Sequence, residues 1–206
     1  MNDRAAFFDA TADGYDGNPF HEGVVRDLIE GLATSGPVGL AVDAATGTGA
    51  AAVVMVDAVR PSQVLAVDIS PAMIRKAQAK AAERGVAKLV TCQVGDAASL
   101  PVCDGAADLI LCASALHFLG AAALRDWHRA LRPGGEVAFS VPMQSDLRPS
   151  PAFRKYVTTD IELPDGVDDA TQLAVQFGFR EARASFTEIM VDGRLRRTLV
   201  VHARKP

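Results

Sequence analysis

Short apolar runs alternate with helical segments from residue 22 to residue 180, and this alternation limits the fold more than any other feature. Runs of four to seven mostly hydrophobic residues are typical of strands that are buried on both faces of a sheet. Repeated strand–helix units with right-handed crossovers form a doubly wound parallel sheet. The five predicted strands are Val38–Asp43, Gln63–Asp68, Lys88–Val94, Asp108–Ala113 and Glu136–Val141.

Helical spacing of apolar residues fills the intervals between these runs. One helix is marked at both ends, because Ser70 is a suitable N-cap, Pro71 suits the first helical position and Gly85 follows the end. The five predicted helices are Glu22–Thr34, Gly49–Val59, Pro71–Arg84, Ala121–Leu131 and Asp168–Phe177.

The C-terminal part of the chain has a different pattern. Two β-rich runs, Ala182–Val191 and Arg194–Arg204, flank Asp192-Gly193, which favours a tight antiparallel hairpin. The expected fold is therefore α/β, with a doubly wound, seven-stranded, mostly parallel sheet and an antiparallel last strand. The segment Met143–Gly166 is long and irregular, and such loops are commonly functional.

Length and composition indicate one globular domain over residues 1–206. The chain has 21 basic and 25 acidic residues, a net charge of -4, which excludes a strongly basic nucleic-acid coat. We expect neither a membrane span nor secretion, because no apolar run approaches roughly 18 residues and the N-terminus lacks a signal core. The three cysteines have no CxxC spacing, so we expect reduced thiols, a cytoplasmic location and no zinc site.

Three aspartates end or follow three of the predicted strands. Asp43 ends the first strand, Asp68 ends the second and Asp96 follows the third. Ligands of open α/β sheets bind outside the carboxyl ends of the strands, where the strand order reverses. One such aspartate would be read as a helix cap or a solvated loop residue, but three at one edge, beside a glycine turn, indicate a ligand site.

The turn after the first strand is rich in small residues. Gly47 and Gly49 allow the backbone to approach a ligand, and the helix that follows offers free N–H groups. Asp68 lies 19 residues after Gly49, from where a carboxylate accepts hydrogen bonds from ribose hydroxyls. The pattern therefore indicates an adenosine ligand.

Asp43 separates two kinds of adenosine ligand. It stands where the pyrophosphate of a dinucleotide would lie, and its charge would oppose that group in a low-dielectric crevice. An ammonium or sulfonium would be attracted instead. Asp96 is placed to accept a hydrogen bond from an exocyclic amine. An adenosine with a positive charge and no phosphate is S-adenosylmethionine.

The ordered motifs resemble those of the class I S-adenosylmethionine-dependent methyltransferases over nearly the whole chain. VDAATGTG is similar to the D-x-G-x-G-x-G loop, VDISPAMIRKAQAKA to the segment after the second strand, and GDAASLP to the third motif. DLILCASALHFL and RALRPGGEVAFS resemble the fourth strand and the turn into the fifth. FFDATADGYDG is similar to the N-terminal lid of the small-molecule branch, which includes the quinone-biosynthesis methyltransferases.

The resemblance implies how S-adenosylmethionine, and its product S-adenosylhomocysteine, would bind. Residues 1–21 would form a lid from which Tyr15 reaches the cofactor, and residues 143–166 would lie on the acceptor side. Ala45 replaces the first glycine of the family loop, and its methyl group narrows the space beside the methionine part of the cofactor. The predicted cofactor-binding residues are Tyr15, Asp43, Ala45, Thr46, Gly47, Gly49, Asp68, Ile69, Met73, Asp96, Ala97 and Ala113.

The methyl acceptor is expected to be a small molecule. A general base is needed only when the acceptor must lose a proton, as a phenol does. His117, just beyond the fourth strand, is the candidate catalytic base, His21 is a second candidate, and packing beneath the lid is the alternative role for His117. Candidates for the apolar wall of the acceptor pocket are Phe7, Phe8, Phe20 and Phe118.

Two other classes of function remain open. A nicotinamide-dependent dehydrogenase would share the fold and Asp68, although Asp43 and the closing hairpin count against it. A catalytically silent S-adenosylmethionine-binding domain would keep the fold without an acceptor pocket. We do not expect nucleic acid as a partner, because basic residues near the C-terminus are typical of a solvated hairpin edge. No cluster has metal-ligand spacing, and the sequence determines neither the acceptor nor the oligomeric state.

Overall fold

Seven strands form one sheet, as the sequence predicts. The structure is a computed structural model that describes residues 3–33 and 36–206. The strand order is β3-β2-β1-β4-β5-β7-β6, parallel from β3 to β5, with β7 antiparallel to both of its neighbours. The strands are β1 (Leu40–Ala44), β2 (Gln63–Asp68), β3 (Val90–Val94), β4 (Ala107–Cys112), β5 (Leu131–Val141), β6 (Arg180–Val191) and β7 (Arg194–Arg204).

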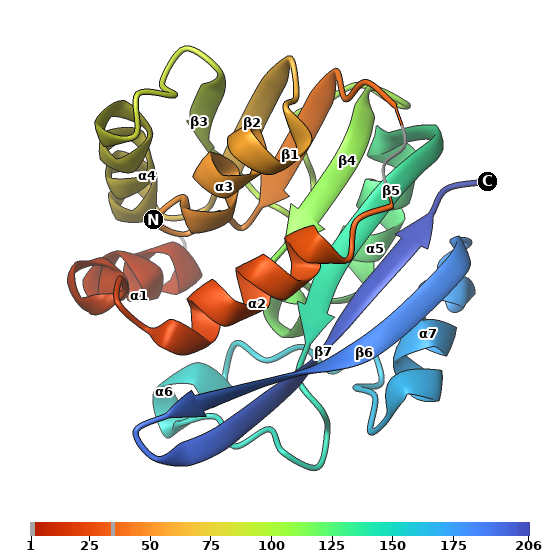
Figure 1. Cartoon of the computed structure of the whole chain (residues 1–206). Helices are drawn as coiled ribbons and strands as arrows, with labels where there is room; N and C mark the ends of the chain where they lie inside the picture. The colour runs from red at the N-terminus through yellow and green to blue at the C-terminus, as the bar shows by residue number, and fades with distance from the viewer. Residues whose placement is uncertain (1–2, 34–35) are drawn as a thin grey trace.

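Helices cover both faces of the sheet (Figure 1). Helices α2, α3 and α4 pack on one face around Leu28, Met55 and Ala81, and α5 and α7 pack on the other around Trp127 and Leu173. Across residues 3–33 and 36–206, none of the helices is long and apolar enough to cross a membrane. The helices are α1 (Asp3–Thr11), the 3-10 turn η1 (Ala12–Gly14), α2 (Pro19–Glu30), α3 (Ala50–Val59), α4 (Pro71–Glu83), α5 (Leu116–Ala130), α6 (Pro151–Arg154) and α7 (Val167–Gln176).

The limits of α4 follow from its capping residues, as predicted. Ser70 Oγ accepts a hydrogen bond from the Met73 N–H at 3.1 Å, and Pro71 occupies the first helical position. Gly85 follows the helix with a φ of +72°, a conformation that glycine adopts without strain. Because the local signals agree at both ends, this helix could be placed from the sequence alone.

Helix α2 begins earlier than predicted. It starts at Pro19 rather than Glu22, because the Asn18 side chain accepts a hydrogen bond from the Phe20 N–H and caps the helix there. Its predicted end, Thr34, lies outside the described residues.

Helix α5 consists of two helical segments joined at Gly120. The predicted start at Ala121 is the start of the second segment only and is wrong for the helix as a whole. The helix begins at Leu116, and Gly120 has a φ of +70°. Asp160 accepts a hydrogen bond from the Ala121 N–H at 3.2 Å and so caps the second segment. The sequence pattern therefore located the second segment and missed the first.

The largest shift of a strand boundary is at β5, which begins at Leu131 rather than the predicted Glu136. Leu131 pairs with Ala107 of β4 before the register shifts, and Gly134 has a φ of +75°. The turn that was expected to precede the strand thus lies within it, because an irregular pairing continues across the turn. The other strand limits differ from the prediction by at most two residues.

The C-terminal hairpin has the predicted tight turn. Val191 pairs with Arg194, and both central residues are left-handed, with φ of +49° at Asp192 and +72° at Gly193. Strand β7 pairs with β5 only as far as Leu199. Beyond that point the hairpin is a two-stranded ribbon that reaches past the sheet, at the lower left of Figure 1.

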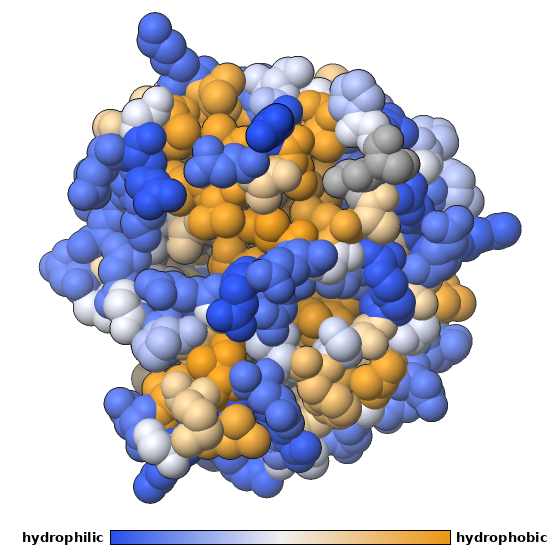
Figure 2. Space-filling view, in the orientation of Figure 1, coloured by the Kyte–Doolittle hydropathy of each residue, from blue (hydrophilic) through white to orange (hydrophobic). Residues whose placement is uncertain are grey.

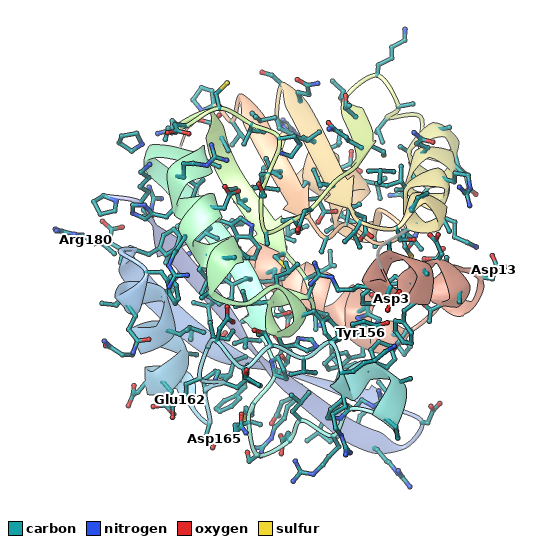
Figure 3. All side chains as sticks on the ribbon, turned by 180° about the vertical axis from the view of Figure 1, so that it is seen from behind. Asp3, Asp13, Tyr156, Glu162, Asp165 and Arg180 are labelled. Carbon is teal, nitrogen blue, oxygen red and sulfur yellow. The ribbon has the colours of Figure 1, made fainter. Side chains whose placement is uncertain are left out.

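Helix α1 and the 143–166 segment meet at the carboxyl ends of the strands. The Tyr156 hydroxyl donates a hydrogen bond to the Asp3 carbonyl at 3.0 Å, and Figure 3 shows the two residues where α6 approaches α1. The 143–166 segment, predicted to be irregular, contains one helical turn, α6. Met1 and Asn2, the first residues of the predicted lid, lie outside the described residues.

A groove of about 620 Å³ runs along the surface between α2, α3 and α4. Its lining combines apolar residues such as Ile29, Val53 and Val54 with charged residues of α2 and α4. In Figure 2, apolar surface is exposed above the hydrophilic band of α2. This groove lies away from the carboxyl ends of the strands, where the ligand site is predicted.

Candidate functional site

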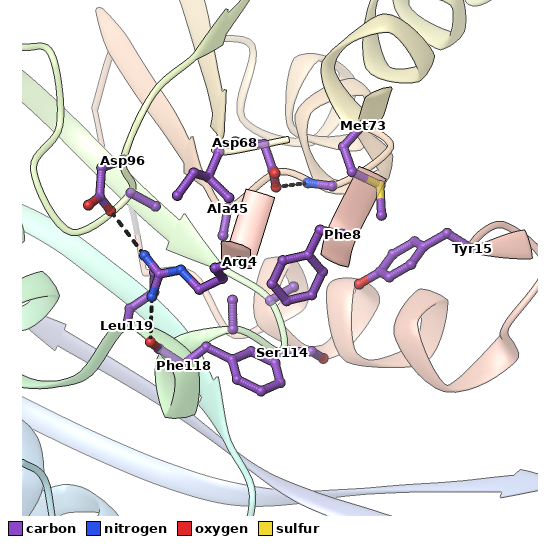
Figure 4. Close-up of a pocket in the computed structure, with 15 residues that line it drawn as sticks. Arg4, Phe8, Tyr15, Ala45, Asp68, Met73, Asp96, Ser114, Phe118 and Leu119 are labelled. Carbon is purple, nitrogen blue, oxygen red and sulfur yellow. Dashed lines mark hydrogen bonds and ion pairs between the residues drawn. The ribbon is translucent and has the colours of Figure 1, made fainter. Parts of the chain in front are cut away.

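A cavity lies at the carboxyl ends of β1, β2 and β4, beneath α1 (Figure 4). Strands β1 and β4 are neighbours there, so the cavity is at the point where the sheet reverses its winding, as predicted. Its predicted lining residues are Tyr15, Ala45, Gly47, Asp68, Ile69, Met73, Asp96, Ala97 and Ala113. Its other lining residues are Arg4, Phe8, Ser114, Ala115, Phe118 and Leu119.

The glycine loop after β1 is shaped by Asp68. One carboxylate oxygen of Asp68 accepts a hydrogen bond from the Gly47 N–H at 2.8 Å, and the other accepts one from the Ser70 N–H at 2.9 Å. Burial raises the pKa of Asp68, and the two hydrogen bonds oppose that rise. Asp68 therefore orders the loop and keeps a buried carboxylate at the cavity wall.

Asp43 and Thr46 lie behind the loop and do not line the cavity. The Thr46 hydroxyl donates a hydrogen bond to the Asp43 carboxylate at 2.5 Å, and the Thr46 N–H donates to the Val67 carbonyl at 2.9 Å. Burial raises the pKa of Asp43 to about 7. Both residues thus support the loop from beneath, and their direct contact with a cofactor stays a prediction.

Ala45 and Gly49 both have left-handed backbone conformations, with φ of +59° and +83°. At Gly49 an added Cβ would lie 2.9 Å from the Cα and Cβ of Ala77 in α4, so this position requires glycine for both conformation and space. Ala45 lines the cavity in a conformation that costs an alanine roughly 1–2 kcal/mol. The residue that departs from the motif is therefore also a strained one.

Tyr15 covers the glycine loop. Its ring lies 3.4 Å from where a Cβ of Gly47 would be, and it stacks on His21 with centroids 5.2 Å apart. Burial raises the pKa of Tyr15 to about 12, and the nearby charge of Asp68 adds to the rise. Tyr15 therefore presents a neutral hydroxyl at physiological pH.

Polar contacts hold α1 over the cavity. Asp9 accepts a hydrogen bond from Ser70 Oγ at 2.5 Å, at the N-terminus of α4. Arg4 donates to the Phe118 carbonyl at 2.9 Å, and its guanidinium lies 3.8 Å from the Asp96 carboxylate. Asp96, which is predicted to accept a hydrogen bond from an adenine amine, thus faces a guanidinium.

With α1 in this position the cavity measures about 60 Å³. Sites for small organic ligands are roughly 300–1,000 Å³. Arg4 and Phe8, both from α1, project into the space in Figure 4. A nucleoside therefore requires α1 to move away from the strand ends.

His117 lies on the first turn of α5, beside the cavity and not among the residues that line it. Its ring packs on Phe118 with centroids 3.9 Å apart, and within the described residues its buried Nδ1 has no hydrogen-bond partner. Burial lowers the pKa of His117 to about 4. The ring is neutral at pH 7 and is a weak base there, so its role as a general base stays a prediction.

Two other histidines make contacts that suit structural roles. A ring nitrogen of His202 in β7 is hydrogen-bonded to the Leu28 carbonyl at 2.8 Å, which joins the sheet to α2. The ring of His128 lies edge-on to Phe179 with centroids 5.2 Å apart. Neither histidine lines the cavity.

Three arginines near the C-terminus form ion pairs within the molecule. Arg183 and Arg204 approach the buried Glu136 carboxylate at 3.0 and 4.0 Å, and Arg197 pairs with Asp146 at 2.8 Å. These pairs join the hairpin to β5 and to the 143–166 segment.

In the part of the chain that the structure describes, no group of His, Cys, Asp and Glu residues is arranged to hold a metal ion.

The sequence reasoning missed four lining residues, Arg4, Ser114, Ala115 and Leu119. Ser114 has a φ of +60° in the turn after β4, and its N–H donates to Ser140 Oγ at 2.7 Å. No glycine or asparagine marks this turn. Arg4 belongs to a helix whose pattern gives no sign of what it covers.

Comparisons with known proteins agree with the motifs. Residues 41–135 match the family model of a methyltransferase domain. A malonyl-[acyl-carrier protein] O-methyltransferase of Methylococcus capsulatus is 34% identical over 137 residues, which cover 65% of this chain and 49% of that protein. An uncharacterized methyltransferase-like protein of Schizosaccharomyces pombe is 30% identical over 90 residues, which cover 43% of this chain and 33% of that protein. The chain thus spans about half or less of these relatives.

Solved structures share the fold at low sequence identity. One is from a complex of the Haloferax volcanii Trm112 methyltransferase activator with a methyltransferase, with a TM-score of 0.78, 19% identity and 97% of each chain covered. Another is an S-adenosylmethionine-dependent methyltransferase of Thermotoga maritima, with a TM-score of 0.68, 18% identity and 98% and 99% of the two chains covered. The sheet order and these likenesses show that the chain has the Rossmann-like fold of the methyltransferases, and the family match itself covers residues 41–135.

Proposed function

We propose that this protein transfers a methyl group from S-adenosylmethionine to a small-molecule acceptor. The observation that carries the proposal is the charge around the cavity. Asp68 and Asp96 line it, Asp43 lies beneath its loop, and the cation among its lining residues, Arg4, faces Asp96. This arrangement attracts a cationic adenosine ligand and repels the pyrophosphate of a nicotinamide dinucleotide.

Each lining residue has a role in this proposal that follows from its position. Asp68 accepts hydrogen bonds from the ribose hydroxyls, Asp96 accepts one from the adenine amine, and Met73 packs against the adenine. Gly47 allows the loop backbone to approach the methionine part, and Tyr15 covers it. The other residues proposed to bind or support the cofactor are Asp43, Ala45, Thr46, Gly49, Ile69, Ala97 and Ala113.

A sulfonium already makes its methyl group electrophilic, so the main task of the protein is alignment. Holding acceptor, methyl carbon and sulfur in line supplies ~7–11 kcal/mol of such a barrier. Because His117 has a pKa of about 4, we expect His117→Ala to lower turnover less than about tenfold. A loss of ~10²–10⁴ with unchanged cofactor affinity, and a single ionisation that the variant lacks, would assign His117 as the base.

The acceptor is proposed to be small, as in the branch that includes the quinone-biosynthesis enzymes. Helix α1 lies directly over the cavity and α6 lies against α1, so a macromolecular acceptor would have to reach beneath them. The Methylococcus capsulatus relative is named for an acyl-carrier protein substrate, and this chain matches 49% of it. That name therefore gives a candidate acceptor to assay and does not assign one.

Ligand-dependent stability tests the cofactor. A ligand present at 100 times its Kd, bound only by the native state, adds about 2.7 kcal/mol of stability. We expect S-adenosylmethionine and S-adenosylhomocysteine to raise the Tm and NAD to leave it unchanged. Stabilisation by NAD alone would contradict the proposal. Stabilisation by S-adenosylhomocysteine without methyl transfer to any assayed acceptor would favour a catalytically silent domain.

A further inference from the structure

Five aromatic rings form a cluster that begins at the cavity and continues outward beneath α1. We call it the aromatic cluster; its members are Phe7, Phe8, Phe118, Phe153 and Tyr156. The ring centroids are 4.8 Å apart for Phe7 and Phe153, 5.2 Å for Phe7 and Tyr156, and 5.7 Å for Phe8 and Phe118. Phe8 and Phe118 also line the cavity (Figure 4). The cluster is thus the apolar continuation of the proposed cofactor site.

The aromatic cluster is separate from the core of the sheet. None of its five rings belongs to either of the two core clusters, and each is only half-buried. Phe7 and Phe8 are the only large apolar side chains of α1. Both make ring contacts within the aromatic cluster.

Both segments that carry the rings have polar attachments of their own. Helix α1 is attached through Asp9 and Arg4, as described above. On the other side, the Thr158 N–H donates to the His117 carbonyl at 2.9 Å, and Asp160 caps the second part of α5. The rings thus lie between two segments that are each anchored elsewhere, and the hydrogen bond from Tyr156 to the Asp3 carbonyl links the two segments directly.

Two of the rings are arranged to receive a flat molecule. Phe118 and Phe153 are within 28° of parallel, and their centroids are 5.9 Å apart. A planar ring in contact with both faces needs about 7 Å between them, at roughly 3.5 Å for each carbon contact. The centroids are 5.9 Å apart and the ring planes are no farther apart than that, so α6 has to move outward to make that room.

Two hydroxyl groups lie at the inner end of this space. Ser114 Oγ lines the cavity, is buried and has no hydrogen-bond partner within the described residues. The hydroxyl of Tyr15 is neutral at physiological pH and points toward the same region in Figure 4. A ligand that fills the aromatic cluster would therefore present its polar atom to two hydroxyls.

We infer that the methyl acceptor is a flat, uncharged aromatic molecule with a hydroxyl or amine, bound with its ring between Phe118 and Phe153 and its polar atom toward Ser114 and Tyr15. This inference rests on the proposed function and adds the substrate class. The ring faces of Phe118 and Phe153 favour a flat acceptor over an aliphatic one, because an aliphatic chain of similar hydrophobicity cannot stack on them.

Calorimetric titration of two matched alcohols tests the inference. The protein, saturated with S-adenosylhomocysteine, is titrated with 1-naphthol and with 1-octanol, which both carry one hydroxyl and differ in flatness. We expect 1-naphthol to bind at least about threefold more tightly. Phe153→Leu keeps an apolar side chain and loses the flat face. It should lower the affinity for 1-naphthol by about threefold to tenfold and leave the affinity for S-adenosylhomocysteine unchanged. Phe186→Leu, which replaces an exposed ring of β6, is the control and should change neither of the two affinities.

Three outcomes would overturn the inference: no binding of 1-naphthol, equal binding of the two alcohols, or equal affinity of the wild type and Phe153→Leu for 1-naphthol. If Phe153→Leu does not fold, Phe7→Leu removes the ring that contacts Phe153 edge-on and is measured in its place. The same titrations without S-adenosylhomocysteine separate the two proposals. Failure of S-adenosylhomocysteine to bind contradicts the proposed function, whereas the preference for 1-naphthol still decides the acceptor class.

Discussion

The two sides of the proposed site are built in different ways. The cofactor side is made of strand ends, where Asp68 accepts hydrogen bonds from the Gly47 N–H of the glycine loop at 2.8 Å and from the Ser70 N–H at 2.9 Å. The acceptor side is made of α1, α6 and the start of α5, which meet through half-buried rings and a few polar contacts. One side is thus part of the sheet, and the other is attached to it.

This difference predicts unequal sensitivity to substitution. Hydrogen bonds to buried charged groups contribute roughly 1.5–3 kcal/mol, whereas exposed ion pairs contribute about 0–1 kcal/mol. Changes on the cofactor side should therefore alter ligand affinity and stability strongly, and changes in α1 should alter them weakly.

Asp68→Ala should have the largest effect. It removes the acceptor of two backbone hydrogen bonds and of the proposed ribose contacts, so the affinity for S-adenosylhomocysteine should fall at least about tenfold and the Tm should also fall. Titration calorimetry and thermal unfolding measure the two changes. Asp57→Ala, an exposed aspartate of α3, is the control. An unchanged Kd would show that the ribose lies elsewhere.

Gly49→Ala should destabilise the cofactor side without removing a polar group. The new Cβ would meet the backbone of Ala77 at 2.9 Å, at a φ of +83°, so we expect a loss of about 1–3 kcal/mol in the free energy of unfolding. Gly85→Ala is a matched control, because its φ is +72° and no atom lies within 4 Å of the added Cβ. Equal losses at the two positions would mean that α4 gives way and that the contact with Ala77 is not tight.

The contrast between the cofactor side and the acceptor side also explains which parts of the site could be predicted from the sequence. Strand ends, the glycine loop and Asp68 follow from local patterns whose spacing is dictated by the sheet, and the structure brings Asp68, Asp96 and Gly47 to one cavity. The tight turn at Asp192-Gly193 was predictable because both residues tolerate positive φ.

The acceptor side could not be predicted in this way. Phe153 and Tyr156 lie in a segment with no periodicity, and they meet Phe7 through contacts about 150 residues apart in the chain. The first turn of α5 was missed because Gly120 and its contact with Asp160 break the helical pattern. Long-range contacts of this kind have no local signal.

Asp43→Asn should change how the cofactor side responds to pH. The pKa of Asp43 is about 7 in the folded protein and ordinarily 3.8, so between these values the native state holds a proton that the unfolded state has lost. The contribution of Asp43 to stability is therefore present at low pH and is lost as pH rises toward 7. Because asparagine does not titrate, the Tm of the variant relative to wild type should increase from pH 5 to pH 7.5.

Ligand binding gives a second readout for the same substitution. A cationic cofactor favours the ionised carboxylate, so the affinity of wild type for S-adenosylmethionine should rise with pH through about 7 and that of Asp43→Asn should not. Thermal unfolding and titrations at matched pH values measure both effects. Parallel curves for the two proteins would mean that Asp43 does not titrate in this range.

Arg4→Ala should have a small effect on the affinity for S-adenosylhomocysteine, opposite in sign to that of Asp68→Ala. The pair with Asp96 is partly exposed, at 22% and 48%, and is worth about 0–1 kcal/mol. Its removal frees Asp96 and loosens α1, so S-adenosylhomocysteine should bind up to about fivefold more tightly. Arg26→Ala, which removes another surface pair, should leave affinity unchanged. A weaker affinity for Arg4→Ala would show that Arg4 itself contacts the ligand.

Ala45→Gly should have the smallest effect, since two contributions to stability oppose each other. Glycine relieves about 1–2 kcal/mol of left-handed strain at a φ of +59° and loses roughly 0.5–1 kcal/mol through the greater freedom of the unfolded chain. The Tm should therefore stay equal or rise slightly, whereas Ala58→Gly in α3 should lower stability by about 1 kcal/mol. The affinity for S-adenosylhomocysteine should stay equal or improve, because the methyl group no longer narrows the cavity. A marked loss of affinity would show instead that this methyl group packs on the ligand, and the cofactor side would then owe part of its binding to the one loop residue that departs from the family motif.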